Sequence, residues 1–420
     1  MGNMIDDFKK PLRRNGQDSR PYAAKIDAQE ETVSEPVFRA PEEVAERELE
    51  SITLPQSLNE PVNKRSPGKF NKLTRHLPNW SKKRWMLALA LILMIGTGGA
   101  AWEALRSRSP ADDGWKASVY KYEPKEPETV ASRLTGVQIS PELNKLPTTG
   151  VIMENSPDAR PQSGLIDAGV VFEAISEGGI TRFLAIYMET KPENLGPVRS
   201  IRPYFLDFLV PFNAPLAHVG GSAEALAQIR QQNIRDIDQM HNPGAYHRRN
   251  HRYAPHNMYT SRNALLDLQR KKGFSESKFE GFVRKAEKKA KTPNATSIDI
   301  SLSSPLYNVH YDYNKENNSY ARVMGGKPHT DEHSGKQIQP KVVVVLISPH
   351  SYRGIYSQYK VTGSGKAFIF QNGTVTEGKW EKKNRSSQFK FGDANGSPVG
   401  LNPGQTWVTL AGGRGMVSFK

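Results

Sequence analysis

The apolar positions of the chain form one long run and, further along, a series of short segments. From Trp85 to Trp102 the sequence WMLALALILMIGTGGAAW contains no charged residue. A helix needs about 20 apolar residues to cross a bilayer, and tryptophan favours the two membrane–water interfaces. A buried helix of a soluble domain would usually carry a polar stripe, which this run lacks. The run therefore predicts one transmembrane helix over residues 85–102.

The charges on either side of this run predict its orientation. Eight lysines and arginines lie between Lys64 and Arg84, against four between Arg106 and Lys121. The positive-inside rule then places the N-terminus in the cytoplasm and the C-terminal region outside the cell membrane. Gly98 and Ala100 would also suit a cleavage site. More than eighty residues of polar chain before the run favour an uncleaved, single-pass signal-anchor instead.

The segments flanking the run lack a regular apolar pattern. Residues 1–84 are rich in Glu, Arg, Pro, Ser and Asn and poor in aromatic residues, which predicts a disordered cytoplasmic tail. The basic residues before Trp85 would be attracted to anionic lipid, or they serve topology alone. Residues 103–130 include YKYEPKEPETV and predict an extended extracytoplasmic stalk.

Short apolar segments return at about Leu134 and continue to the C-terminus. Buried strands or short helices are predicted at 150–153, 169–175, 180–188 and 214–219. Helical spacing after a serine N-cap predicts helices at 222–231, 261–270 and 275–288. Residues 131–292 are therefore predicted to form a mixed α/β module.

Beyond Pro293 the pattern changes to alternation and β-branched runs. Strands are predicted at 297–302, 307–313, 341–347, 366–370 and 406–411. Asn372-Gly373, between two of these runs, is a two-residue hairpin signal. Residues 293–420 should thus form a mostly β module, and the predicted fold class of the outer region is α+β.

The composition of the chain excludes some kinds of chemical site and favours anionic partners. The 420 residues include no cysteine, which excludes disulfides, thiolate metal sites, thiol nucleophiles and a lipid-modified N-terminal cysteine. The net charge of +15 favours anionic surroundings. Thirteen lysines and arginines between Arg248 and Lys291, against four acidic residues, predict a basic helical face. Outside the membrane this face could meet anionic wall polymers, lipid, glycans or DNA, or it could simply be solvated.

Four polar clusters combine charged residues with glycine and proline turns, at 155–165, 173–182, 196–204 and 254–261. If the fold brings their arginines together, the guanidinium groups would form a fork-shaped site for carboxylate, phosphate or sulfate. Glu173 and Glu177 could instead pair with them in a structural network. The residues predicted for the anion site are Arg160, Arg182, Arg199, Arg202, His218, Ser222, His256 and Asn257.

Catalytic and metal-binding alternatives rest on fewer residues. Glu173, Glu177, Asp207 and His256 could act as general acid and base, with Ser222 as a nucleophile, but no complete constellation is present and no catalytic residue is assigned. Histidines four residues apart, at 247 and 251 and at 329 and 333, would suit a metal on a helix, yet neither pair has a third ligand of clear spacing. No metal and no cofactor are expected.

The four polar clusters occur in the same order as in a known family. Together with HVGGSAEA at 218–225 and the segments 373–380 and 401–407, they resemble the YerB-like family of bacterial envelope lipoproteins over about residue 131 to the end. The resemblance implies an envelope-anchored protein with an N-terminal α/β module and a smaller C-terminal module. The family is described mainly as a domain of unknown function, so the resemblance assigns no catalytic residues.

This chain lacks the family's lipobox cysteine, and the helix predicted at Trp85 to Trp102 would replace the lipid. The prediction is a non-catalytic envelope module that binds an anionic wall component or an envelope protein. The alternatives are a hydrolase of wall glycan or peptide that uses Glu173, Glu177 and His256, and a surface protein that binds DNA through Lys288, Lys289 and Lys291.

Overall fold

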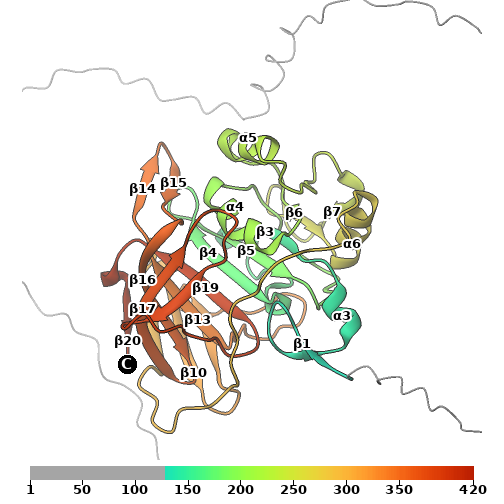
Figure 1. Ribbon diagram of the computed structural model, residues 1–420. Coiled ribbons are helices and arrows are strands. Elements are labelled where there is room, and N and C mark those ends of the chain that lie inside the picture. The colour runs from blue at the N-terminus through green and yellow to red at the C-terminus, as the bar shows by residue number, and fades with distance from the viewer. Residues whose placement is uncertain (1–127) are drawn as a thin grey trace, which may run out of the picture. The chain divides into compact units, whose positions relative to one another are not determined.

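The structure is a computed structural model that describes residues 128–420, and Figure 1 shows how their strands and helices are arranged. The helix predicted from Trp85 to Trp102, the predicted tail and nearly all of the predicted stalk lie outside this range. None of the helices between residues 128 and 420 is both long enough and apolar enough to span a bilayer.

A nine-stranded sheet runs through the centre of the described region. Its strand order is β18-β17-β16-β13-β19-β4-β5-β3-β6. The first five strands are β18 (Lys390–Asp393), β17 (Thr374–Lys382), β16 (Gly363–Gln371), β13 (Val342–Ile347) and β19 (Thr406–Ala411). The other four are β4 (Val170–Ile175), β5 (Thr181–Tyr187), β3 (Thr149–Glu154) and β6 (Leu216–Ala217).

The sheet is continuous across the two halves of the sequence. Strand β19 pairs in parallel with β13 on one side and with β4 on the other, where Thr406 lies opposite Val170. In Figure 1 the orange and red C-terminal strands therefore run directly into the green strands of the N-terminal half. Every residue of β3, β4, β5 and β19 is buried, as expected for strands covered on both faces. A charged residue on these strands must therefore find its partners inside the protein.

A smaller sheet covers the C-terminal half of one face, in the order β12-β11-β10-β9-β20. Its strands are β9 (Ser297–Ile300), β10 (Val309–Asn314), β11 (Ser319–Met324), β12 (Lys327–Pro328) and β20 (Val417–Phe419). Ile298 and Tyr311 of this sheet pack with Val343 and Phe370 of the large one. The C-terminal half is thus a sandwich of two sheets, in agreement with the predicted mostly β module.

Helices cover the N-terminal half of the sheet. On one face lie α4 (Pro203–Leu209) and α5 (Ala223–Gln231), whose apolar side chains share a core with Phe172 and Ile152. The opposite face carries α6 (Arg262–Lys271) and the hairpin of β7 (Tyr246–Arg248) and β8 (Met258–Thr260). Shorter peripheral elements are β1 (Val130–Ala131), β2 (Gln138–Ile139), α3 (Pro141–Lys145), β14 (His350–Arg353) and β15 (Tyr356–Tyr359). The predicted α+β class is therefore confirmed for the described residues.

Local signals were reliable where a cap or turn residue carried them. Ser222 and Ser261 are the N-caps of α5 and α6, and their hydroxyl oxygens accept hydrogen bonds from the amides of residues 225 and 264. Asn372 and Gly373 have φ angles of 62° and 76° and join β16 to β17. These left-handed angles are those that a two-residue hairpin requires.

The helix predicted at 275–288 is wrong, because residues 275–292 contain no helix. The backbone of this segment bonds elsewhere: Leu401 donates to the carbonyl of Val283, and Lys285 donates to the carbonyl of Leu401. The Arg284 side chain donates to the carbonyl oxygens of Leu134 and Asn402. The C-terminal part of the predicted basic helical face is therefore an extended segment, along which Lys285, Lys288, Lys289 and Lys291 are exposed.

Candidate functional site

Polar side chains gather at the edge where β3 and β4 end and β5 begins. Glu154 is the last residue of β3, Glu177 follows β4, and Arg182 is the second residue of β5. Both β3 and β4 pair antiparallel with β5, so their carboxyl ends lie at the same edge. Open α/β sheets bind ligands at the carboxyl ends of strands. We call the groups at this edge the strand-end site.

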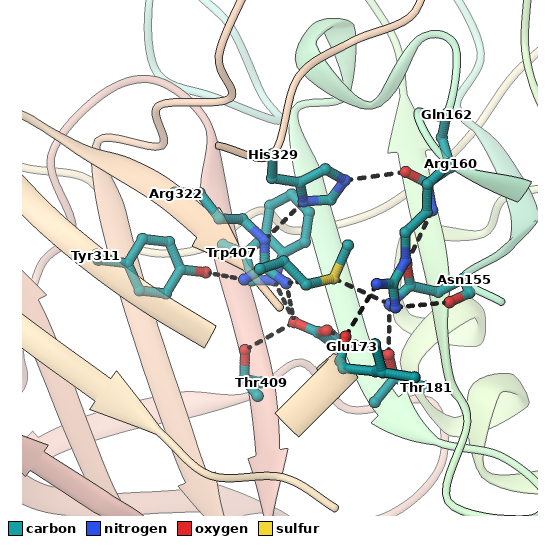
Figure 2. A network of polar contacts seen from close by, with 12 residues as sticks. Asn155, Arg160, Gln162, Glu173, Thr181, Tyr311, Arg322, His329, Trp407 and Thr409 are labelled. Carbon is teal, nitrogen blue, oxygen red and sulfur yellow. Dashed lines mark hydrogen bonds and ion pairs between the residues drawn. The ribbon is translucent and has the colours of Figure 1, made fainter. Parts of the chain in front are cut away.

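Behind this edge lies a buried ion pair that joins the two halves of the sequence. Nη2 of Arg322, on β11, is 2.8 Å from Oε2 of Glu173, on β4, and both side chains are fully buried. The Trp407 indole N–H also donates to Glu173, at 3.0 Å. The Arg322 guanidinium lies 4.2 Å from the Trp407 ring centroid. Figure 2 shows these groups between the strands of the two halves.

The direction of each hydrogen bond around this ion pair follows from the arginine. Because arginine can only donate, Nδ1 of His329 accepts the 3.0 Å bond from Nε of Arg322, and the ring proton is on Nε2. That N–H donates to Oε1 of Gln162 at 2.9 Å. Burial and the neighbouring guanidinium groups hold the pKa of His329 well below its usual value, in agreement with a neutral ring.

Three more hydrogen bonds connect Gln162 back to Glu173. Gln162 donates to Asn155 at 2.9 Å, Asn155 donates to Thr181 at 2.6 Å, and Thr181 donates to Oε1 of Glu173 at 3.4 Å. We call this closed ring of Glu173, Arg322, His329, Gln162, Asn155 and Thr181 the buried circuit (Figure 2). Since Glu173 is enclosed within it, the carboxylate is out of reach of a substrate.

Arg182 and Arg202 share the single carboxylate of Glu177. Arg182 donates to Oε1, and Nε of Arg202 donates to Oε2 at 2.9 Å. Burial alone would raise the pKa of Glu177, but the two guanidinium groups outweigh it and lower that pKa. Glu177 is therefore an anion at neutral pH and is unsuited to act as a general acid.

Arg199 and His256 converge on a second carboxylate, Glu154. Nε of Arg199 lies 3.3 Å from Oε1 of Glu154, and Nδ1 of His256 lies 2.9 Å from the same oxygen. Ser156 donates to this oxygen at 2.8 Å and also lies 3.2 Å from Nδ1 of His256. A serine–histidine–acid relay needs the serine and the acid on opposite ring nitrogens. Here Ser156 and Glu154 both face Nδ1. On the opposite side Asp158 lies 3.9 Å from Nε2, beyond hydrogen-bond distance, so the relay geometry is absent.

Glu154 and Ser156 were not identified from the sequence, although Glu154 directly precedes the first polar cluster and Ser156 lies within it. The second carboxylate oxygen of Glu154 is buried without a hydrogen-bond partner among the described residues. The side chains of Arg199 and His256 are 26% and 24% exposed. Together with Glu177, whose side chain is 23% exposed, they are the members of the strand-end site that an external ligand could reach.

The other predicted site residues lie in separate contacts. Arg160 donates from Nε to Asn155 at 3.1 Å and so borders the buried circuit. His218 is buried between the carbonyl of Gly220 and the carboxylate of Asp236. The Ser222 hydroxyl caps α5, as described above. Asn257 donates to two carbonyl groups of its own loop and accepts from Arg248, and Asp207 pairs with Arg385.

A further carboxylate, Glu332, holds the basic loop between β7 and β8. Nε2 of His251 lies 2.7 Å from Oε1 of Glu332, Arg252 lies 3.2 Å from the same oxygen, and Arg249 lies 3.4 Å from Oε2. Burial would raise the pKa of Glu332, but a hydrogen bond from Ser163 and the neighbouring arginines, Arg252 and Arg249, lower it. Between residues 128 and 420 no three His, Cys, Asp or Glu side chains are grouped as a metal site would require.

Comparisons with known proteins agree with this architecture. Residues 134–275 match the family model described as "Protein of unknown function (DUF3048) N-terminal domain", and residues 298–408 match the corresponding C-terminal domain. The chain is 30% identical over 284 residues to a protein of Bacillus subtilis (strain 168) named "Putative lipoprotein YerB", covering 66% of this chain and 85% of that protein. The crystal structure of the YerB protein from Bacillus subtilis superimposes with a TM-score of 0.64 at 27% identity, covering 69% of this chain and 99% of that one. The chain therefore belongs to the YerB-like family, whose two modules have the descriptions DUF3048 N-terminal and DUF3048 C-terminal domain.

Proposed function

We propose that residues 131–420 form a non-catalytic binding module on the outer side of the cell membrane and that the strand-end site binds an anionic component of the cell wall. The name of the Bacillus subtilis relative as a lipoprotein supports an envelope location. The apolar run from Trp85 to Trp102 and the excess of basic residues before it support a membrane anchor with this orientation.

The observation that carries the proposal is the charge balance at the strand-end site. Three guanidinium groups, those of Arg182, Arg199 and Arg202, face two carboxylates, those of Glu154 and Glu177. The guanidinium groups therefore exceed these two carboxylates by one positive charge. Because Arg199 is partly exposed, an incoming carboxylate or phosphate can reach its guanidinium and complete the balance.

A hydrolytic role receives less support from the same geometry. Glu173 is enclosed in the buried circuit, and Glu177 is held as an anion by two arginines. His256 remains partly exposed, but its acidic partner is Glu154 rather than either of these glutamates.

The test uses the full chain in lipid nanodiscs, sedimented with isolated Gram-positive cell wall. Wall from which the anionic polymers have been removed by acid extraction serves as a second substrate. We expect binding at low salt that weakens with added salt, with extraction of the polymers and with Arg199→Gln. Arg230→Gln is the matched control, because Arg230 is an exposed arginine at the far end of α5.

Three results would contradict the proposal. If the chain bound intact and extracted wall equally well, the anionic polymers would be excluded as its ligand. Release of soluble wall fragments by the wild-type chain, abolished by Glu154→Gln, would establish a hydrolase instead. Binding of DNA that is lost when Lys288, Lys289 and Lys291 become alanine would move the site to the extended segment.

A further inference from the structure

A pocket lies between the two modules, apart from Arg199 and His256. Its volume is about 440 Å³. Its N-terminal wall includes Pro157, Arg160 and Pro161, and its C-terminal wall includes Leu306, Met324 and Lys327. We propose that this pocket binds a small organic anion, with its carboxylate or phosphate group on Arg160 and an apolar body against the remaining wall.

Arg160 supplies a fixed cation with unused donors. Its Nε and Nη2 donate to the side chain and the carbonyl of Asn155, at 3.1 and 2.9 Å, and Nη1 donates to the carbonyl of Leu306 at 2.9 Å. The guanidinium also lies 4.9 Å from the ring centroid of Tyr307. A guanidinium has five N–H bonds, so two remain for a ligand. Since these contacts hold the side chain in place, a ligand need not order it on binding.

The charge in the pocket has no counterion within the described residues. Arg160 makes no ion pair there, and the nearby Glu173 is already paired with Arg322. None of the ten residues lining the pocket is acidic. Asp158, on the same turn, approaches His256 of the strand-end site instead, at 3.9 Å. Lys327, exposed at the rim, adds a second cation.

The rest of the wall suits an apolar body. Of the two apolar side chains from the C-terminal module that line the pocket, Leu306 is 53% exposed and Met324 is buried. Pro157, Pro161 and Pro328 contribute further apolar surface without side-chain donors. A ligand that covers Leu306 removes apolar surface from water, which a bare phosphate or chloride ion cannot do. The pocket thus favours an anion that is part of an amphiphilic molecule over a simple salt ion.

The experiment measures binding of fluorinated probes to the full chain in lipid nanodiscs by ¹⁹F NMR, with empty nanodiscs as the blank. Two probes are anionic, 4-(trifluoromethyl)benzoate and 4-(trifluoromethyl)phenylphosphonate. Two probes keep the ring without the negative charge, 4-(trifluoromethyl)benzyl alcohol and 4-(trifluoromethyl)benzylamine. We expect saturable binding of the two anions, with a Kd on the order of 1 mM as is usual for fragments of this size, and no saturable binding of the alcohol or the amine.

Two variants at the rim, Lys327→Gln and Leu306→Ser, locate the probe without changing a side chain that bonds to the buried circuit. Lys327→Gln should raise the Kd of the anionic probes about threefold, which is the effect expected from losing an exposed charge pair. Leu306→Ser should weaken them by a similar factor, through the loss of apolar contact. Arg160→Lys, which keeps the charge but loses the fork, should weaken them about tenfold. Lys315→Gln, at an exposed lysine in the turn between β10 and β11, is the matched control and should leave binding unchanged.

Three outcomes would overturn the proposal. The alcohol could bind as well as the benzoate, which would make the pocket simply apolar. The anions could fail to saturate at any accessible concentration. Finally, binding could survive Lys327→Gln and Leu306→Ser but disappear in Arg199→Gln, which would assign the probe to the strand-end site. The last result would leave the proposed function intact, so the two proposals fail independently.

Discussion

Replacing Arg322 with methionine would leave the carboxylate of Glu173 buried without its cation. Both side chains are fully buried and their charged atoms lie 2.8 Å apart. Glu173 would keep neutral donors, the indole of Trp407 at 3.0 Å and the hydroxyl of Thr181 at 3.4 Å. These donors solvate the charge but do not neutralise it. The converse change, Glu173→Gln, would leave the Arg322 guanidinium with only neutral partners.

The cost follows from the burial of both charges. Breaking a fully buried pair by removing one partner costs about 3–5 kcal/mol, because the remaining charge is uncompensated. Removing both charges in Glu173→Gln/Arg322→Met should cost less, about 1–2 kcal/mol, since only hydrogen bonds are then lost. At roughly 2–4 °C per kcal/mol, either single variant should lower the Tm by about 6–20 °C.

The assay is urea unfolding of the full chain and its three variants, followed by circular dichroism and completed as a double-mutant cycle. The conservative variant Arg322→Lys keeps the charge but loses the contacts to Tyr311 and His329, and it should fall between the wild type and Arg322→Met. A double variant that loses as much stability as the two single variants added together would refute the reasoning. So would a cost below about 1 kcal/mol for Arg322→Met alone.

Three further changes follow from local contacts. Because folding lowers the pKa of Glu332, this carboxylate stabilises the fold at pH values above its unfolded pKa. The stabilisation is lost as the pH falls through the lower folded pKa. When the free energy of unfolding is measured from pH 3 to pH 7, its decrease towards low pH should therefore be smaller in Glu332→Gln than in the wild type. Burial would lower the pKa of His310, but the two aspartates on either side of its ring outweigh burial and raise it. His310→Asn should therefore lower the free energy of unfolding at pH 5 but not at pH 9, and an equal loss at both pH values would contradict this. Ser261→Ala removes the N-cap bond of α6 and should cost about 1 kcal/mol in urea unfolding, more than Ser222→Ala, whose cap bond is longer; the reverse order would count against capping as the cause.

The sequence by itself determined most of the local structure. Runs of β-branched residues predicted strands such as β13 and β19, and serines 222 and 261 predicted where α5 and α6 begin. The hairpin at Asn372-Gly373 could also be predicted from the sequence, since few other residue pairs adopt its left-handed angles. In each case the signal and the structure lie within a few residues of each other, so propensity alone was sufficient.

Tertiary contacts determined the conformation of residues 275–292 and the partners of the polar side chains. The spacing of apolar residues there is helical, yet its backbone bonds to Leu401, more than a hundred residues later, and this pairing prevails over local propensity. Glu173 and Arg322 are 149 positions apart in the sequence, and Glu154 and His256 are 102 positions apart. Composition could select these residue types but not their partners, because the partners are set by which strands pair. The parallel pairing of β4 with β19 brings the two halves of the chain together, and with them the buried circuit and the pocket beside it.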